Sequence, residues 1–178
     1  MRRLYLLPLL LAAVLLLAAC GRASPPPPAS EVLAVMLSAM KDTAQPIPDG
    51  AVRLTSAPAD SPDYLTETFF AALYGEAARG LLGGDSAPSF PITDAALFLS
   101  LSPYPCELAC FRCADESAAR TVAGLCRGRL DTLSQGYAES EWAGVATGGQ
   151  VAVKGNWVLL ALCEDPSQIL EAARRASE

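Results

Sequence analysis

The fold is decided by residues 150–163, QVAVKGNWVLLALC, in which two apolar runs flank the dipeptide Gly155-Asn156. A glycine followed by a small polar residue is typical of the two-residue loop of a tight hairpin. We therefore expect one strand over 150–154 and a second over 157–163. The second run is apolar on both faces, which indicates a sheet that is covered on both sides.

Two further apolar runs precede the hairpin, over 95–101 and 108–113, and both are predicted to be strands. A long helix is expected to follow them, from Asp115 to about Gly136. After the hairpin, Asp165-Pro166 opens a last helix, since proline is favoured in the first helical turn. The order strand–strand–helix occurs twice, which predicts an α+β fold with a four-stranded, mainly antiparallel sheet.

Two additional helices are expected at the N-terminal side of these elements. Ser30 is the expected cap of the first, and Ser61 of the second, with Pro62 in its first turn. Between them, the proline-rich stretch 46–62 is expected to be irregular or to hold a short edge strand at Val52-Arg53-Leu54. These two helices are the candidates for the second cover of the sheet.

Residues 1–19 begin with two arginines, continue as an aliphatic run and end in small residues, which is the pattern of a secretory signal peptide. The apolar run is too short to cross a bilayer as a helix. Residues 17–20, LAAC, resemble the lipobox of bacterial lipoproteins. The resemblance implies a diacylglyceryl thioether at Cys20, cleavage before it, and anchoring at the extracytoplasmic face of the cell membrane. The alternative is an ordinary signal peptide that leaves Cys20 as a free thiol.

Residues 20–30 contain the expected lipidated cysteine and a proline-rich spacer. Each proline fixes φ and lacks a backbone donor, so the run Pro25–Pro28 should extend as polyproline II. Residues 31–178 then form a single extracytoplasmic α+β domain. A domain of about 150 residues buries enough surface to fold without disulfides or a metal ion.

The composition argues against several functions. The chain contains no histidine, which removes Ser-His-Asp and Cys-His catalysis and imidazole-ligated metal sites. Its net charge is −6, and Arg2 and Arg3 of the leader are two of its basic residues. An acidic domain of this kind is not expected to bind nucleic acid, because phosphates repel it.

Several motifs together resemble one protein family. They are the lipobox, the early pair of helices, the strand 107–112 (ELACFR), the aromatic loop at Tyr137 and above all 151–160 (VAVKGNWVLL). They look like a family of small bacterial lipoproteins known as domain of unknown function 4358, from about Glu31 onward. That family has no assigned activity, so the resemblance implies a location and a fold but no catalytic residue.

The cysteines beyond Cys20 allow several interpretations. These five are Cys106, Cys110, Cys113, Cys126 and Cys163. The first three have the C-x3-C-x2-C spacing of some iron–sulfur proteins, but strand alternation would send Cys110 and Cys113 to opposite faces. A disulfide or a thiolate zinc site is conceivable in an exported domain. We favour buried cysteines that act as small apolar residues.

The loop 136–149 holds the candidate contact residues. Tyr137 and Trp142 flank the acids Glu139 and Glu141. Aromatic residues beside acids on a loop can contact a glycan or a peptide, or the aromatics can plug the core under the loop, which we favour. The other acid pairs, at 115–116 and 164–165, lie where helix N-termini favour negative charge.

A basic stripe is expected on the long helix, formed by Arg120, Arg127 and Arg129. Salt bridges to Asp115, Glu116 and Asp131 are the predicted explanation.

The function that the sequence supports is therefore a membrane-anchored binding or accessory module of the cell envelope, with an envelope protein or glycan as partner and no cofactor. The alternative is a hydrolase of envelope polymers with Glu139 or Glu141 as its acid. A purely structural envelope protein is the third class.

Overall fold

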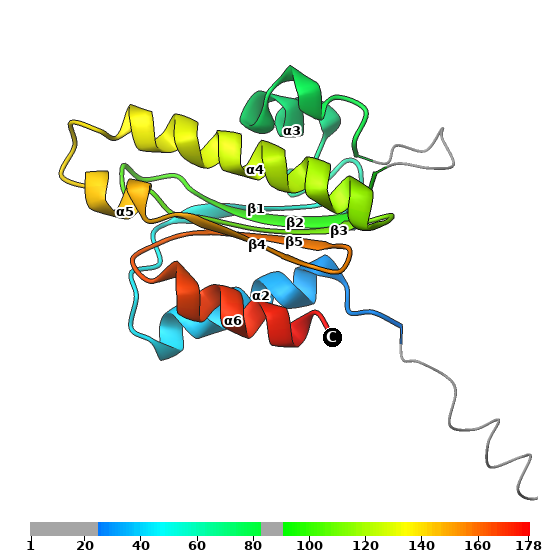
Figure 1. The fold of residues 1–178 in the computed structure, drawn as a ribbon, viewed down its shortest axis with the longest axis horizontal. Coiled ribbons are helices and arrows are strands. Elements are labelled where there is room, and N and C mark those ends of the chain that lie inside the picture. The colour runs from blue at the N-terminus through cyan, green and yellow to red at the C-terminus, as the bar shows by residue number, and fades with distance from the viewer. Residues whose placement is uncertain (1–24, 83–90) are drawn as a thin grey trace, which may run out of the picture.

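A computed structural model describes residues 25–82 and 91–178 of the chain. It is an α+β fold in which a five-stranded antiparallel sheet lies between two layers of helices (Figure 1). The leader and Cys20 lie outside the described residues. Within the described part of the chain, no helix is both long and apolar enough to span a membrane.

The sheet has the strand order β1-β2-β3-β5-β4, and all neighbours are antiparallel. The strands are β1 (Gly50–Leu54), β2 (Ile92–Ser100), β3 (Glu107–Cys113), β4 (Gln150–Lys154) and β5 (Trp157–Leu162). The predicted α+β class and the predicted hairpin are confirmed, whereas the prediction of four strands is wrong by one. The stretch around Val52 is the fifth strand, since it pairs with β2 along its whole length.

The β4–β5 hairpin shows how the local sequence produces the turn. Lys154 pairs with Trp157, so the loop consists of Gly155 and Asn156 alone. Gly155 has a φ of 56°, a left-handed value that glycine adopts without a steric cost. Glycine as the first central residue of a two-residue loop matches the twist of the two strands.

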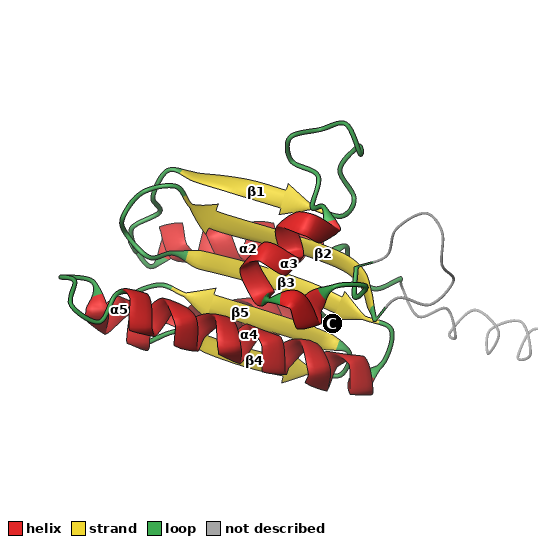
Figure 2. Ribbon diagram, turned by 90° about the horizontal axis from the view of Figure 1, so that it is seen from above, coloured by secondary structure: helices red, strands yellow, loops and turns green. Residues whose placement is uncertain are grey.

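Helices cover both faces of the sheet, as the apolar β5 predicted. One layer consists of α2 (Ala29–Asp42) and α6 (Pro166–Ala176). The other consists of α3 (Glu67–Tyr74), the 3-10 turn η1 (Glu76–Ala78) and α4 (Glu116–Gly136), which is followed by the short α5 (Ala143–Thr147). Figure 2 shows α3 and α4 in front of the sheet and α2 behind it.

The expectation that the first two helices share one face is wrong. After α2 the chain forms edge strand β1, and it then continues to α3 on the opposite face. Each face therefore combines one early helix with one later helix. Each layer has its own core: Phe70 and Leu160 lie in the core under α3 and α4, and Met36 and Leu159 lie in the core under α2 and α6.

The predicted start of the first helix is wrong by two residues, since the expected cap was Ser30. Pro28 occupies the cap position of α2, and no side chain of its own segment caps the helix. Instead the backbone N–H of Ala29 donates to Oδ2 of Asp94 at 2.8 Å. A buried carboxylate on β2, 65 residues away, thus replaces the expected Ser30 cap.

The predicted start of the second helix is also wrong. The helix begins at Glu67 and is capped by Thr66, whose Oγ1 accepts from the N–H of Phe69 at 3.1 Å. The preceding residues pair with the end of β1 instead, since Leu54 N–H donates to Asp63 O and Leu65 N–H donates to Leu54 O. A helix starting at Ser61 would remove these bonds.

Candidate functional site

A cavity of about 220 Å³ lies at the end of the sheet where β2 turns into β3. Its apolar wall is made by leucines from the sheet and from helices α3 and α4: Leu73, Leu99, Leu133 and Leu162. Tyr137, the residue that follows α4, also lines it. The cavity is therefore formed by the last turns of α3 and α4 above the ends of β2, β3 and β5.

The polar wall of the cavity is a buried ion pair. Glu107, the first residue of β3, is 2% exposed. Its Oε2 accepts from Nε of Arg129 at 3.0 Å and lies 3.0 Å from Nη2 of the same guanidinium. Tyr74 donates its hydroxyl to the other oxygen, Oε1, at 3.0 Å. Burial, and next the negative charge of Glu107, raises the pKa of Tyr74 well above its ordinary value, so this phenol stays protonated.

Arg129 keeps donors that the protein does not use. Two of its three guanidinium nitrogens contact Glu107, and Nη1 has no partner among the described residues. Guanidinium carries five N–H groups in a fixed plane, which suits it to bind carboxylate or carbonyl oxygens. A ligand in the cavity would therefore meet a carboxylate that is paired with Arg129, and donors of Arg129 that this pair does not use.

The rim of the cavity combines an exposed leucine with two hydroxyls. Leu101 lies in the β2–β3 turn and is 74% exposed, although it is a large apolar residue. Ser100 and Ser102 on either side of it have their Oγ atoms 3.0 Å apart, and both line the cavity. The apolar surface of Leu101 is therefore available for contact with a molecule that enters the cavity.

An aromatic pair lies beside this turn, and one of its members, Tyr104, also lines the cavity. The rings of Tyr104 and Trp142 pack edge to face with centroids 5.0 Å apart, and Trp142 lies against the core under α2 and α6. The hydroxyl of Tyr104 is buried without a partner in the described part of the chain. Burial raises the pKa of Tyr104 to about 12. Trp142 is thus a plug of the loop that follows α4, the alternative that the sequence favoured.

The structure separates the four residues predicted to form a contact site. Tyr137 lines the cavity, and Trp142 packs into the core. Glu139 and Glu141 are exposed in the turn between α4 and α5, and neither lines the cavity. Only Tyr137 therefore belongs to the candidate site.

The predicted salt bridges of the arginine stripe are wrong for Arg129. Its partner is Glu107 on β3, not Asp131 or another acid of the same helix. Asp115 instead caps α4, because its Oδ1 accepts from Ala118 N–H at 2.8 Å. Sequence reasoning missed the site because Arg129 falls on the apolar stripe of its helix. The sequence did carry a signal of this pair. Arg129 is a charged residue on the apolar stripe of a helix, and Glu107 is an acid at the start of an apolar strand.

The five described cysteines are free and buried. Cys110 and Cys113 belong to the cores on opposite faces, as strand alternation predicted. Burial raises the pKa of Cys106 and of Cys163 to about 12, so their thiols are protonated at neutral pH. Among the residues that the structure describes, no group of three or more cysteine or acidic side chains could hold a metal ion.

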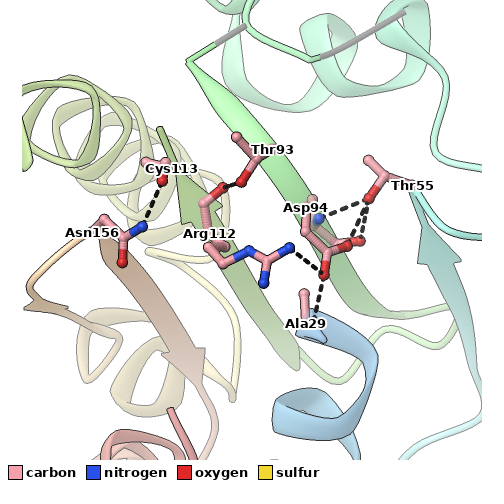
Figure 3. A network of polar contacts seen from close by, with 8 residues as sticks. Ala29, Thr55, Thr93, Asp94, Arg112, Cys113 and Asn156 are labelled. Carbon is pink, nitrogen blue, oxygen red and sulfur yellow. Dashed lines mark hydrogen bonds and ion pairs between the residues drawn. The ribbon is translucent and has the colours of Figure 1, made fainter. Parts of the chain in front are cut away.

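A second buried carboxylate lies at the opposite end of the sheet (Figure 3). Asp94 accepts from Ala29 N–H at 2.8 Å and from the Thr55 hydroxyl at 3.0 Å, and Nη2 of Arg112 lies 3.9 Å from it. Asn156 closes the same end, donating from Nδ2 to the carbonyl oxygen of Cys113 at 2.7 Å. Asp94 on β2 is thus surrounded by donors of the protein itself. These donors link it to the start of α2, to the residue that follows β1, and to β3.

The fold and the cavity define the class to which the chain belongs: a single α+β domain with a small, partly polar pocket at one end of an antiparallel sheet. Comparison with protein-family models, with curated proteins and with solved structures found no match to this chain.

Proposed function

We propose that this chain is a lipoprotein anchored through Cys20 at the extracytoplasmic face of the cell membrane, and that its domain binds an envelope protein in the cavity. One observation carries the binding proposal. The leucine-lined cavity has the Glu107–Arg129 pair in its wall and opens beside the exposed Leu101. The lipobox and the resemblance to the lipoprotein family support the anchor.

The size of the cavity favours one side chain of a larger partner. Pockets for whole small molecules usually measure about 300–1,000 Å³, and this cavity is smaller. Its leucines suit an apolar side chain, while Arg129 and the two serines suit the carbonyl groups on either side of such a residue. We therefore propose a protein segment with an apolar anchor residue as the ligand.

The position of the cavity supports the same proposal. The spacer joins the domain at Ala29, which contacts Asp94 near the start of β2 (Figure 3). The cavity lies at the other end of β2. Nine residues of strand separate the two ends by about 27 Å. A membrane anchor attached to the spacer would therefore leave the mouth of the cavity open.

Site-specific photocrosslinking tests the binding proposal. A photoreactive phenylalanine derivative replaces Leu101 in the full chain in its own membrane, and replaces the similarly apolar, exposed Val35 on α2 as a control. We expect a discrete protein adduct from position 101 and none of the same mass from position 35. An adduct that appears equally from both positions would contradict a site at the cavity.

A cavity-filling variant makes the test specific. Leu133→Trp fills the cavity, and Leu125→Trp places the same bulk on the same helix away from it. The adduct from position 101 should disappear in the first variant and persist in the second. An adduct that survives Leu133→Trp, or a position 101 that captures only glycan, would overturn the proposal of a protein ligand in the cavity.

The anchor is tested by the intact mass of the mature protein from its membrane. We expect residues 20–178 plus a diacylglyceryl group, and we expect Cys20→Ser to remain unprocessed. A mature mass without lipid would contradict the anchor while leaving the cavity proposal intact.

A further inference from the structure

The edge of β4 is open along its whole length. In an antiparallel pair, residues alternate between those bonded to the neighbour and those whose backbone groups point away from it. The tight loop makes Lys154 and Trp157 a bonded pair, so Ala152 also bonds to β5, while Val151 and Val153 point their N–H and C=O groups outward. Among the described residues, these four groups have no hydrogen-bond partner.

The opposite edge, at β1, is blocked. Leu54 points outward there, but its N–H donates to Asp63 O at 2.8 Å and its C=O accepts from Leu65 N–H at 2.9 Å. The carbonyl of Val52 accepts from Nη1 of Arg53 at 2.8 Å. Proteins usually protect sheet edges in such ways, because an open edge pairs with other chains. The protection of β1 makes the openness of β4 informative.

We infer that β4 pairs antiparallel with β4 of a second copy of this chain, about a two-fold axis at Ala152. This register places Val151 of each copy opposite Val153 of the other. The four outward groups of one copy and the four of the other then form four backbone hydrogen bonds. Val153 is 39% exposed in the single chain and would be covered by this pairing. Gln150 falls opposite Lys154, so no like charges meet across the new pair.

The surfaces beside the edge also suit a second copy. A groove of about 390 Å³ runs next to β4 and is lined by Arg127, Asp131 and Val151, among others. It carries one basic and one acidic residue, both exposed and neither in an ion pair within the described chain. The surface therefore does not repel its own copy.

The symmetry is compatible with two membrane anchors. An axis that relates neighbouring antiparallel strands stands perpendicular to the sheet, so both copies keep their α2–α6 layers on the same side. Each spacer joins its domain at the start of α2. Both spacers therefore leave from one face of the ten-stranded assembly and can reach one membrane.

A cysteine on the axis tests this inference directly. In the proposed register Ala152 faces its own copy in a pair without hydrogen bonds, where Cα atoms lie about 4.5 Å apart, a distance that a disulfide can span. Ala152→Cys in the full chain should form a disulfide-linked dimer on mild oxidation in the membrane. Ala51→Cys, an alanine on the blocked edge β1, should not, and it also reports any linkage through other thiols.

Light scattering on the purified full chain provides the second measurement. We expect twice the mass of one chain for the unmodified protein and the mass of one chain for Val153→Lys, whereas Val35→Lys, a matched exposed valine on α2, should remain dimeric. A single-chain mass for the unmodified protein would overturn the inference. So would a dimer that Val153→Lys leaves intact, or an Ala152→Cys chain that does not crosslink.

Discussion

Asp94 and Glu107 are both buried carboxylates, on the neighbouring strands β2 and β3, but they lie at opposite ends of the sheet and have different surroundings. Asp94 is surrounded by donors of its own chain: a helix N-terminus, a hydroxyl and an arginine. Glu107 shares its arginine with a cavity. The difference separates an end that holds the fold together from an end that is available to another molecule.

The largest expected effect comes from breaking the pair at the cavity end. Arg129→Leu leaves Glu107 buried and without a counter-charge, which should lower the free energy of unfolding by about 3–5 kcal/mol. Urea unfolding measures it. The double variant Glu107→Gln/Arg129→Leu should recover most of the loss, because no buried charge remains. A double variant as unstable as the single one would show that Arg129 stabilises by packing alone.

The next effect comes from the structural end. Asp94→Ala removes the acceptor for Ala29 N–H and for the Thr55 hydroxyl, which should cost about 2–3 kcal/mol. The adduct formed through position 101 should persist, since the cavity is untouched. Urea unfolding and the crosslinking assay check the two parts. Loss of the adduct in a folded Asp94→Ala protein would contradict the division between the two ends.

A smaller effect is expected for Tyr74→Phe, which removes one hydrogen bond to Glu107 and should cost about 1 kcal/mol at pH 7. Because burial holds the pKa of Tyr74 above its ordinary value of 10, the folded state favours the protonated phenol. The protonated Tyr74 phenol therefore contributes its full stabilisation below pH 10, and this contribution is lost as the pH rises through the raised pKa of Tyr74. The difference between wild type and Tyr74→Phe should therefore shrink above pH 10. A constant difference would contradict the raised pKa.

The smallest effect on stability is expected at the rim. Leu101→Ser changes an exposed side chain and should alter the free energy of unfolding by less than about 0.5 kcal/mol. Binding of the captured partner should nevertheless weaken about tenfold or more, as for an anchor residue at an interface. Val35→Ser is the matched control and should change neither quantity. Equal binding by both variants would remove Leu101 from the site.

Local sequence signals predicted much of this fold and little of its site. The Gly155-Asn156 hairpin, the strands that flank it and the cap at Asp115 depend on neighbours in the chain, and the structure has them where the sequence placed them. The starts of α2 and α3 were mispredicted because distant residues decide them. Asp94 binds the first N–H of α2, and pairing with β1 delays α3 until Thr66.

The candidate site depends even more on distant contacts. Glu107, Arg129 and Tyr74 lie on three separate elements, and only the packing of α3 and α4 on the sheet brings them together. Tyr137 was predicted from the sequence because aromatic residues beside acids stood out on one loop. The acids themselves, Glu139 and Glu141, lie in the same turn but are exposed away from the cavity.

Hydrogen exchange of the chain, alone and with the protein captured through position 101, tests the central claim most directly. The account predicts slower exchange at 99–107 and 129–137 around the cavity on binding. It predicts no change at 29–33 and 92–95, where Asp94 holds the start of α2. Protection that falls on the Asp94 end, with none around Glu107 and Arg129, would contradict it.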